Sequence, residues 1–280
     1  MRGIMFVEKG KAAIIDEAMP VMDADSMLLK TRYSGLSNGT ERSFLMDGSY
    51  GHTLPYPKRI AYQHVSEVVE CGENITRFKV GDMVFSSTYP GHVEYHVLKD
   101  NDLVIKLTPD TDLECAALFG VASVAFHNVG RASVNEADSV LVIGDGLIGQ
   151  FVAQFARVLG ARVMMGGHHD DRLAIAQACG VEAVTNTSHT MQPISDNAPY
   201  TVIFECSGAD ILDNLLELVG VRSHARLVLV AGRFDVRYNF NKAGRAEVNI
   251  LHTQHFNHDD LENVADLVAQ QAVHIRPLIR

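Results

Sequence analysis

The chain has 280 residues, of which 47% are hydrophobic and 21% are charged. These values are close to globular averages and exclude disordered, collagen-like and coiled-coil classes. Lys and Arg total 24 against 34 Asp and Glu, a net charge of −10, and no basic run is present. Binding to phosphate backbones needs clustered Lys and Arg, so nucleic acid is excluded as a partner.

No part of the sequence is typical of an exported or membrane protein. The apolar run near the N-terminus, Ile4–Val7, is much shorter than the hydrophobic region of a signal peptide. No stretch approaches the roughly 18 apolar residues that span a bilayer. The four cysteines form no C-x-x-C pair, which favours reduced thiols over disulfides. We therefore expect a cytoplasmic protein with no membrane partner.

Two patterns of hydrophobicity divide the chain. Up to about Pro109, short β-rich runs are broken by Gly and Pro, which predicts an irregular β domain. From Ser139 onward, apolar strands alternate with amphipathic helices, which predicts a parallel sheet wrapped by helices. The runs of the first part are Met27–Thr31, Val65–Cys71, Met83–Ser86, Val93–Leu98 and Leu103–Leu107. The strands of the second are SVLVIG, ARVMMG, TVIFECSG, RLVLVAG and VNILHT, and a helix is expected within Leu113–Val129.

A glycine-rich loop follows the first of these parallel strands. Residues 139–160 read SVLVIGDGLIGQFVAQFARVLG, with G-x-G-x-x-G directly after the strand and an amphipathic helix that Gly160 ends. In dinucleotide-binding loops the first glycine permits the tight turn, the second lets the backbone approach the pyrophosphate, and the third allows close helix packing. The loop therefore predicts a pyrophosphate site at the helix N-terminus. Its residues are Gly144, Gly146, Leu147, Ile148 and Gly149.

The end of the next strand indicates which dinucleotide is bound. No Asp or Glu stands there to hold the ribose 2′-OH, and the strand ends in two glycines, Gly166 and Gly167. The glycines leave room for a 2′-phosphate, and potential donors follow at His168, His169 and Arg172. The sequence thus predicts a preference for NADP(H) over NAD(H). Two alternatives are that Asp170 or Asp171 turns back to the ribose and that the histidine pair is only a solvated loop.

Two further strand ends carry small residues where ligands bind in open α/β sheets. We expect the nicotinamide side of the cofactor to be lined by Ser207, Gly208, Ala231 and Gly232.

Several stretches, taken together and in order, resemble the medium-chain dehydrogenase/reductase superfamily over nearly the whole chain. Besides the glycine loop they are YSGLSNGTERS (Tyr33–Ser43), AYQHVSEVVECG (Ala61–Gly72), FKVGDMV (Phe78–Val84), GHVEYHV (Gly91–Val97) and IRPLI (Ile275–Ile279). The element GLSNGTE resembles the zinc-less subgroup that contains bacteriochlorophyllide dehydrogenase and related tailoring enzymes.

The resemblance implies an α/β protein with two domains. A GroES-like irregular β domain would cover residues 1–112, with 272–280 returning to it. A Rossmann domain with a doubly wound parallel sheet would cover 113–271. The superfamily usually continues with about one more strand-helix-strand return after IRPLIR, where this sequence ends.

The residues at the zinc positions of the superfamily argue against a metal. Zinc dehydrogenases supply a Cys, a His-Glu pair and a third Cys or Glu. Here Ser37 stands at the Cys position, Val65 follows His64 in place of Glu, and Gly120 stands at the third position. The structural-zinc lobe is also missing between Ser86 and Gly91. We therefore expect no zinc.

A run of three histidines is the other candidate metal group. His252, His255 and His258 have the spacing of one helical face, and a solvent-facing role is favoured over a metal site.

The resemblance implies that a group of polar residues lies near the nicotinamide: Ser37, Asn38, Thr40, Tyr62 and His64. Without zinc, hydroxyl and imidazole groups would polarise the substrate oxygen. We expect His64 to be the acid/base, because the pKa of imidazole is about 6.5, and Glu41 to orient it. The proton could instead be carried by Tyr62 or Thr40, with His64 only bonding locally. A loop containing Tyr89 and His92 would either select substrate or form a packed turn.

The predicted function is that of a zinc-independent, NADP(H)-dependent oxidoreductase that interconverts an alcohol and a carbonyl on a small or medium polar substrate. The alternatives are an NADPH-dependent quinone or enoyl reductase and a non-catalytic NADPH-binding protein. The resemblance also implies a homodimer that extends the sheet through Val248–Thr253, since an apolar sheet edge invites pairing. The alternative is an edge covered by Asp259–Gln271.

Overall fold

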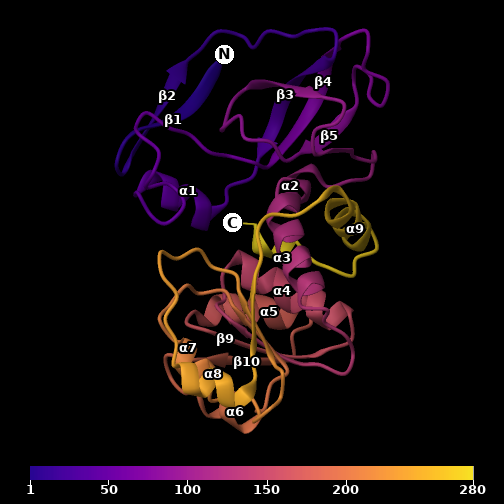
Figure 1. The fold of residues 1–280 in the computed structure, drawn as a ribbon. Helices are drawn as coiled ribbons and strands as arrows, with labels where there is room; N and C mark the ends of the chain where they lie inside the picture. The colour runs from indigo at the N-terminus through magenta and orange to yellow at the C-terminus, as the bar shows by residue number, and fades with distance from the viewer. Residues whose placement is uncertain (280) are drawn as a thin grey trace. The chain divides into compact units, whose positions relative to one another are not determined.

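The protein forms two compact units, which we describe separately from a computed structural model covering residues 1–279 (Figure 1). The first unit contains Met1–Val121 and Asn257–Ala265, and the second contains Ala122–Phe256 and the chain from Asp266 onward. In Figure 1 the colour follows the residue number, so most of the first unit is indigo to magenta, whereas its C-terminal segment, which includes the start of α9, is yellow.

The boundaries differ from the expected domains at the C-terminus. The segment that returns to the first unit is 257–265, whereas 272–280 stays with the second. Val273 and Ile275 are buried there, and the backbone of His274 is held on both sides by Gln154, whose Oε1 accepts from the His274 N–H at 2.7 Å. Ile275, the first residue of IRPLI, is therefore buried in the second unit.

The first unit is built on antiparallel sheets. A hairpin pairs β1 with β2, and a five-stranded sheet has the order β6-β3-β4-β5-β7. The strands are β1 (Arg2–Glu8), β2 (Lys11–Asp16), β3 (Ser26–Ser34), β4 (His64–Cys71), β5 (Met83–Ser86), β6 (Tyr95–Lys99) and β7 (Val104–Lys106). Its core contains Met27, Leu29, Val68, Phe78, Val84, Leu98 and Val104. Helix α1 (Asn38–Leu45) follows β3.

All five strands predicted for this unit are present, but three elements were not predicted. The β1–β2 hairpin gives a weak pattern because β2 buries little, with Ile14 70% exposed. Helix α1 is short and contains Gly39, which disfavours a helix, and the Ser37 side chain before it makes no cap hydrogen bond, so its pattern is weak.

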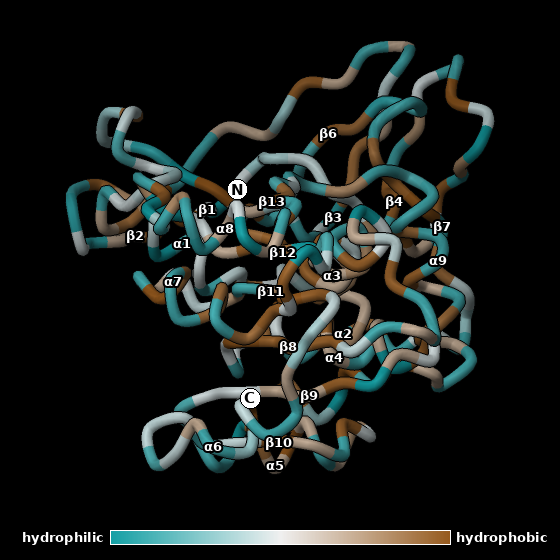
Figure 2. Tube along the Cα trace, turned by 60° about the horizontal axis from the view of Figure 1, so that its bottom comes forward, coloured by the Kyte–Doolittle hydropathy of each residue, from teal (hydrophilic) through white to brown (hydrophobic). Residues whose placement is uncertain are grey.

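The second unit contains a six-stranded parallel sheet of order β10-β9-β8-β11-β12-β13. The strands are β8 (Ser139–Ile143), β9 (Arg162–Gly167), β10 (Ala183–Asn186), β11 (Val202–Glu205), β12 (Arg226–Leu229) and β13 (Asn249–His252). Strands β8 and β11 are buried along their whole length, and their apolar residues appear brown in Figure 2. The strand order reverses at β8, and ligands of such sheets bind beyond the strand ends at this reversal.

The helices of the chain after Pro109 follow the predicted alternation. They are α2 (Leu113–Ala116), α3 (Phe119–Arg131), α4 (Leu147–Val158), α5 (Asp170–Ala178), α6 (Gln192–Asp196), α7 (Leu212–Leu215), α8 (Phe240–Ala246), α9 (His258–Ala269) and the 3-10 turn η1 (Arg276–Leu278). The helix expected within Leu113–Val129 is two helices, and the short strand β10 was not predicted. Within residues 1–279, no helix combines the length and the apolar character needed to cross a membrane.

Candidate active site

The glycine loop joins the carboxyl end of β8 to α4. Gly144 has a φ of +115°, a conformation that favours glycine. A Cβ on Gly149 would lie 1.9 Å from the carbonyl oxygen of Gly144, so only glycine allows the helix this close to the loop. The N-cap residue Gly146 has no side-chain cap, and a Cβ there would meet nothing within 4 Å. The first N–H groups of α4 are thus free to bind an anion, as the sequence predicts.

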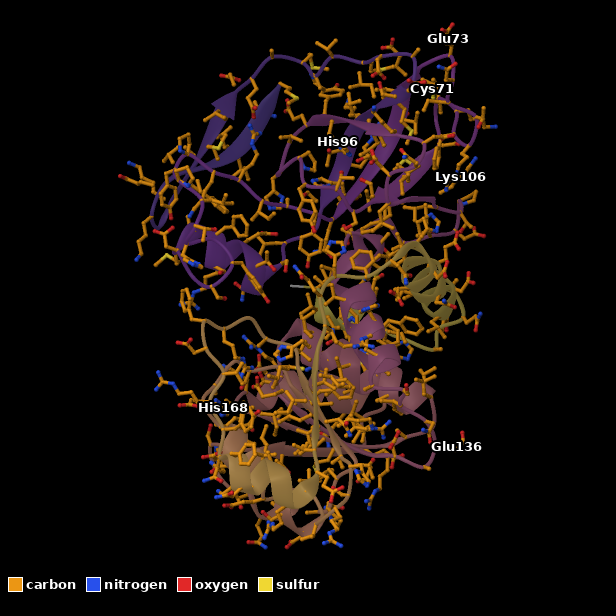
Figure 3. The ribbon with its side chains drawn as sticks, in the orientation of Figure 1. Cys71, Glu73, His96, Lys106, Glu136 and His168 are labelled. Atoms are coloured by element: carbon orange, nitrogen blue, oxygen red, sulfur yellow. The ribbon has the colours of Figure 1, made fainter. Side chains whose placement is uncertain are left out.

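Asp145, inside this loop, contacts the residues predicted to bind a 2′-phosphate. Its Oδ2 accepts from the N–H groups of His168 at 2.6 Å and His169 at 2.8 Å, and lies 3.0 Å from the His169 Nδ1. Its Oδ1 accepts from the Arg172 guanidinium at 3.3 Å. The side chain of His168, labelled in Figure 3, is exposed. The structure therefore brings His169 and Arg172 together on a carboxylate that the sequence reasoning did not single out.

The alternative that Asp170 turns back to the ribose receives no support from its contacts. Its Oδ1 accepts from the Asn186 Nδ2 at 2.7 Å, next to β10. The carboxylate at the end of β9 is that of Asp145.

Glu205 organises the two other strand ends predicted to line the cofactor site. It is completely buried at the end of β11, forms an ion pair with Arg233, and accepts from the N–H groups of Ser207 at 2.8 Å and Gly208 at 3.0 Å. Arg233 directly follows Ala231 and Gly232, so this one carboxylate links the turn after β11 to the turn after β12. The sequence analysis did not single out Glu205; an acidic residue that ends the apolar run Val202–Glu205 is the signal that could have found it.

In the first unit, the hydroxyl groups of Ser37 and Tyr62 form a pair. The Tyr62 Oη donates to the Ser37 Oγ at 3.1 Å, and both side chains are buried. Burial raises the pKa of Tyr62 to about 12, and the negative charge of Glu41 acts in the same direction, against the hydrogen bonds to Ser37 and Thr40. Tyr62 is therefore a protonated hydrogen-bond donor at neutral pH. The structure brings four predicted residues together here: Ser37, Thr40, Glu41 and Tyr62.

Glu41 contacts His92 and not His64, contrary to the expectation from the sequence. Its Oε1 accepts from the Ser37 N–H at 2.8 Å, and its Oε2 lies 3.2 Å from the His92 Nε2. The other ring nitrogen of His92 lies 2.6 Å from the Ser34 Oγ. Because Ser37 precedes α1 and Glu41 lies one turn into it, the carboxylate folds back over the helix start and meets the 89–92 loop. His92 thus belongs to the site, and the substrate-selecting interpretation of this loop stays a prediction.

His64 lies apart from this arrangement, inside the sheet at the start of β4. Its Nε2 is 2.9 Å from the Gly91 carbonyl oxygen, and its Nδ1 has no hydrogen-bond partner within residues 1–279. Its ring centroid is 5.0 Å from that of His96, which Figure 3 labels on β6. The pKa of His64 is lowered to about 4, mainly by burial and in part by His92, against the opposing effect of the hydrogen bond to Gly91, and burial together with His64 lowers the pKa of His96 to about 3. These are the contacts of a packed, neutral imidazole.

Among residues 1–279, neither Gly120 nor the three C-terminal histidines, which the sequence analysis considered as metal positions, form a metal site. Gly120 packs against Gln63, whose Cγ would lie 2.8 Å from a Cβ at that position. The three C-terminal histidines do not share a helical face, because His252 ends β13, His255 has a φ of +62° and His258 begins α9. In the part of the chain that the structure describes, no three His, Cys, Asp or Glu side chains are grouped so as to hold a metal ion.

The fold is that of an α/β unit with a parallel sheet and a glycine-rich loop after its β8 strand, together with an irregular β unit. Residues 148–270 match the family model described as "Zinc-binding dehydrogenase". The chain is 22% identical to sorbitol dehydrogenase of Halalkalibacterium halodurans, over 96% of this chain and 88% of that protein.

Solved structures give the same fold. Galactitol-1-phosphate dehydrogenase from Escherichia coli superposes with a TM-score of 0.86 at 21% identity, over 100% of this chain and 92% of that one. A dehydrogenase from Sinorhizobium meliloti 1021 bound to NADP superposes with a TM-score of 0.84 at 18% identity, over 98% and 90%. Residues 148–270 are therefore similar to the zinc-binding dehydrogenase family and the chain as a whole to sorbitol dehydrogenase, and its fold is the one with GroES-like and Rossmann units that these solved dehydrogenases have.

Proposed function

We propose that this protein is a pyridine-nucleotide-dependent oxidoreductase that interconverts an alcohol and a carbonyl on a small or medium polar substrate. The observation that carries the proposal is the glycine loop, in which Gly144 and Gly149 cannot be replaced without strain and the start of α4 is open. The names of the relatives, which include sorbitol and galactitol-1-phosphate dehydrogenases, favour a polyol or a sugar-like alcohol as substrate.

We assign the cofactor contacts to two strand ends and one helix start. The pyrophosphate would be held by the loop from Gly144 to Gly149, and the nicotinamide side by Ser207, Gly208, Ala231 and Gly232, whose turns Glu205 fixes. NADP(H) is the preferred cofactor in this proposal, because Gly166 and Gly167 end β9 without an acidic side chain and His168, His169 and Arg172 follow. The nicotinamide accepts or supplies the hydride.

Tyr62 is the residue that we propose to hold the proton for the substrate oxygen, in place of His64. Its Oη carries a proton at neutral pH and is already aligned by Ser37. In carbonyl reduction Tyr62 donates this proton to the carbonyl oxygen as the hydride reaches the carbon. Alcohol oxidation is the reverse, in which the Tyr62 phenolate accepts the proton of the substrate hydroxyl, and the Ser37 hydroxyl is the hydrogen-bonded partner in both directions. Glu41 and His92 position the start of α1, since Glu41 binds the Ser37 N–H.

We further propose that the reaction is zinc-independent, as in the zinc-less subgroup that GLSNGTE resembles. Tetrahedral zinc sites use thiolate, imidazole and carboxylate ligands. The first unit instead offers a hydroxyl at Ser37, a protonated phenol at Tyr62 and a buried imidazole at His64 that is bonded to a carbonyl. This donor set does not fit a zinc ion.

A homodimer is the oligomeric state that we propose. Strand β13 ends the sheet order, and Ile250 and Leu251 on it are only partly buried. Pairing of two such edges would satisfy their free backbone groups. Solution mass measurement tests this, and a strict monomer contradicts it.

The first experiment is a thermal shift with NADPH, NADH and no nucleotide, run beside zinc analysis. A ligand that binds the native state raises the melting temperature by mass action. We expect stabilisation by nucleotide and no stoichiometric zinc. The absence of any shift would refute the dinucleotide site, and stoichiometric zinc would refute the metal-free mechanism.

The second experiment is the Tyr62→Phe variant assayed with polyols and their carbonyl forms. We expect turnover to fall by about 10²–10⁴, the usual contribution of a general acid or base, with nucleotide binding unchanged. Tyr50→Phe is the matched control, because it removes the same hydroxyl group from an exposed tyrosine of the same unit that has no role in this proposal. Unchanged turnover in Tyr62→Phe would remove this tyrosine from the mechanism. Turnover of quinones or enones but not of alcohols would favour the alternative reductase.

A further inference from the structure

The space above the end of β9 is occupied by a carboxylate from another segment. A Cβ on Gly167 would lie 2.5 Å from the Asp145 Oδ2, so the glycine is required by Asp145, which is only 6% exposed. Rossmann strands ordinarily carry the acidic residue that binds the ribose at this strand end. Here the chain places an acidic group there from the glycine loop.

This carboxylate uses the donors that a 2′-phosphate would need. The N–H groups of His168 and His169, the His169 ring and the Arg172 guanidinium all face Asp145 at 2.6 to 3.3 Å. Although burial alone raises the pKa of Asp145, the hydrogen bonds from His169 and His168 outweigh it and lower the pKa overall. The group is therefore a carboxylate at neutral pH and offsets the positive charge of Arg172.

The cluster is held in place from behind by Gln150, a buried residue of α4. Its Nε2 donates to the Arg172 carbonyl at 2.8 Å and to the Asp145 carbonyl at 3.4 Å. The glycine loop and the first turn of α5 are thus joined through backbone atoms as well as through the Asp145 side chain. The distance between Asp145 and Arg172 is therefore set by the fold.

We propose that Asp145 is a specificity-determining residue for the cofactor, because it competes with a 2′-phosphate for the donors at the start of α5. The proposal rests on the dinucleotide site proposed above. A phosphate and the Asp145 carboxylate repel each other and share the same acceptor role toward Arg172 and His169. NADPH must share or displace the carboxylate contacts, whereas NADH, which lacks the 2′-phosphate, does not. Asp145 thus limits the preference for NADPH that Arg172 and the histidines create.

The test measures the Kd of NADPH and of NADH for the full-length protein and four variants. Asp145→Asn keeps an oxygen for the two N–H groups and removes the charge, and we expect it to raise the NADPH-to-NADH affinity ratio by about tenfold. Arg172→Gln should lower this ratio, because it removes a donor for the 2′-phosphate. In the double variant Asp145→Asn/Arg172→Gln, the increase that Asp145→Asn causes should be smaller, because the Asp145 carboxylate acts through its contact with Arg172. Asp170→Asn is the control, since this neighbouring carboxylate contacts Asn186 instead.

The outcomes separate this inference from the proposed function. If both nucleotides bind and Asp145→Asn leaves the ratio unchanged or shifts it toward NADH, the inference is overturned and the dinucleotide site stands. If the unmodified protein binds neither nucleotide, the proposed function fails and this inference fails with it. Asp145→Ser, which is smaller and also uncharged, gives the same comparison should Asp145→Asn not fold.

Discussion

The two units hold their candidate residues by opposite electrostatic means. In the second unit, the buried carboxylates of Asp145 and Glu205 are satisfied by backbone N–H groups and by guanidinium groups at strand ends. In the first, Glu41 is also a buried acid that binds a backbone N–H group, but the polar groups around Tyr62 and His64 are otherwise neutral hydroxyls and imidazoles. We therefore expect the second unit to depend on retained charges, whereas the first depends on groups remaining uncharged.

The largest expected decrease in the free energy of unfolding comes from removing the carboxylate of Glu205. In Glu205→Ala, Arg233 would keep a mostly buried charge without its partner, and the N–H groups of Ser207 and Gly208 would lose their acceptor. Breaking a buried pair from one side costs about 3–5 kcal/mol, so denaturant unfolding should show a loss of this size.

A matched variant lies in the same unit on an exposed pair. Glu217 binds Lys242 at 2.6 Å, and its side chain is 59% exposed. Exposed ion pairs contribute about 0–1 kcal/mol, so Glu217→Ala should unfold at nearly the denaturant concentration of the unmodified protein. Equal losses for the two variants would contradict the importance that we give to burial of the Glu205 pair.

Lowering the pH should reduce the folding stability of the first unit, because His64 and His96 are buried as neutral imidazoles. Their pKa values in the fold, about 4 and about 3, lie below the value of about 6.5 in an unfolded chain. The native state therefore binds fewer protons, and stability falls as the pH drops from about 6.5 toward 4. By about pH 4 each of the two imidazoles accounts for a loss on the order of 3 kcal/mol, since one pKa unit corresponds to about 1.4 kcal/mol.

His96→Asn should reduce this pH dependence because it removes one of the two buried imidazoles. Unfolding midpoints are compared at about pH 7.5 and about pH 5, where histidine changes its charge in an unfolded chain. The difference between the two pH values, and not the absolute stability, is the measured quantity. His189→Asn, at an exposed position, should leave the difference unchanged. If His96→Asn keeps the full pH dependence, the loss arises at other groups.

The repeating patterns of the chain were enough to predict the five-stranded sheet, most of the parallel sheet and the glycine loop. Strands such as β8 and β4 have strong apolar signals, whereas β10, β1 and β2 are short or bury too little to stand out. The glycine spacing also predicted the conformations of Gly144 and Gly149, because a local turn is determined by residues close in sequence.

The polar partners could not be predicted in the same way, because they meet across long separations. Glu41 and His92 are 51 positions apart, Glu205 and Arg233 are 28 apart, and Asp145 and His169 are 24 apart. Residue types alone do not show which of several histidines or acids will meet once the elements have packed. This is why the sequence favoured His64 as the proton carrier, whereas the structure places Tyr62 beside Ser37.

The smallest expected changes in stability come from two glycine-to-alanine variants in the glycine loop. Comparing them distinguishes an effect on folding from an effect on nucleotide binding. Gly149→Ala would place a Cβ 1.9 Å from the Gly144 oxygen and push α4 away from the loop, at a cost of about 1–3 kcal/mol. Gly146→Ala meets no atom within 4 Å, so its stability should change by less than about 0.5 kcal/mol. Both variants should weaken nucleotide binding in a thermal shift, Gly149→Ala through the displaced helix and Gly146→Ala because its methyl group stands where the pyrophosphate approaches. If Gly146→Ala binds NADPH and NADH as tightly as the unmodified protein, the pyrophosphate does not lie over this loop, and the glycines serve only the packing of α4 on β8.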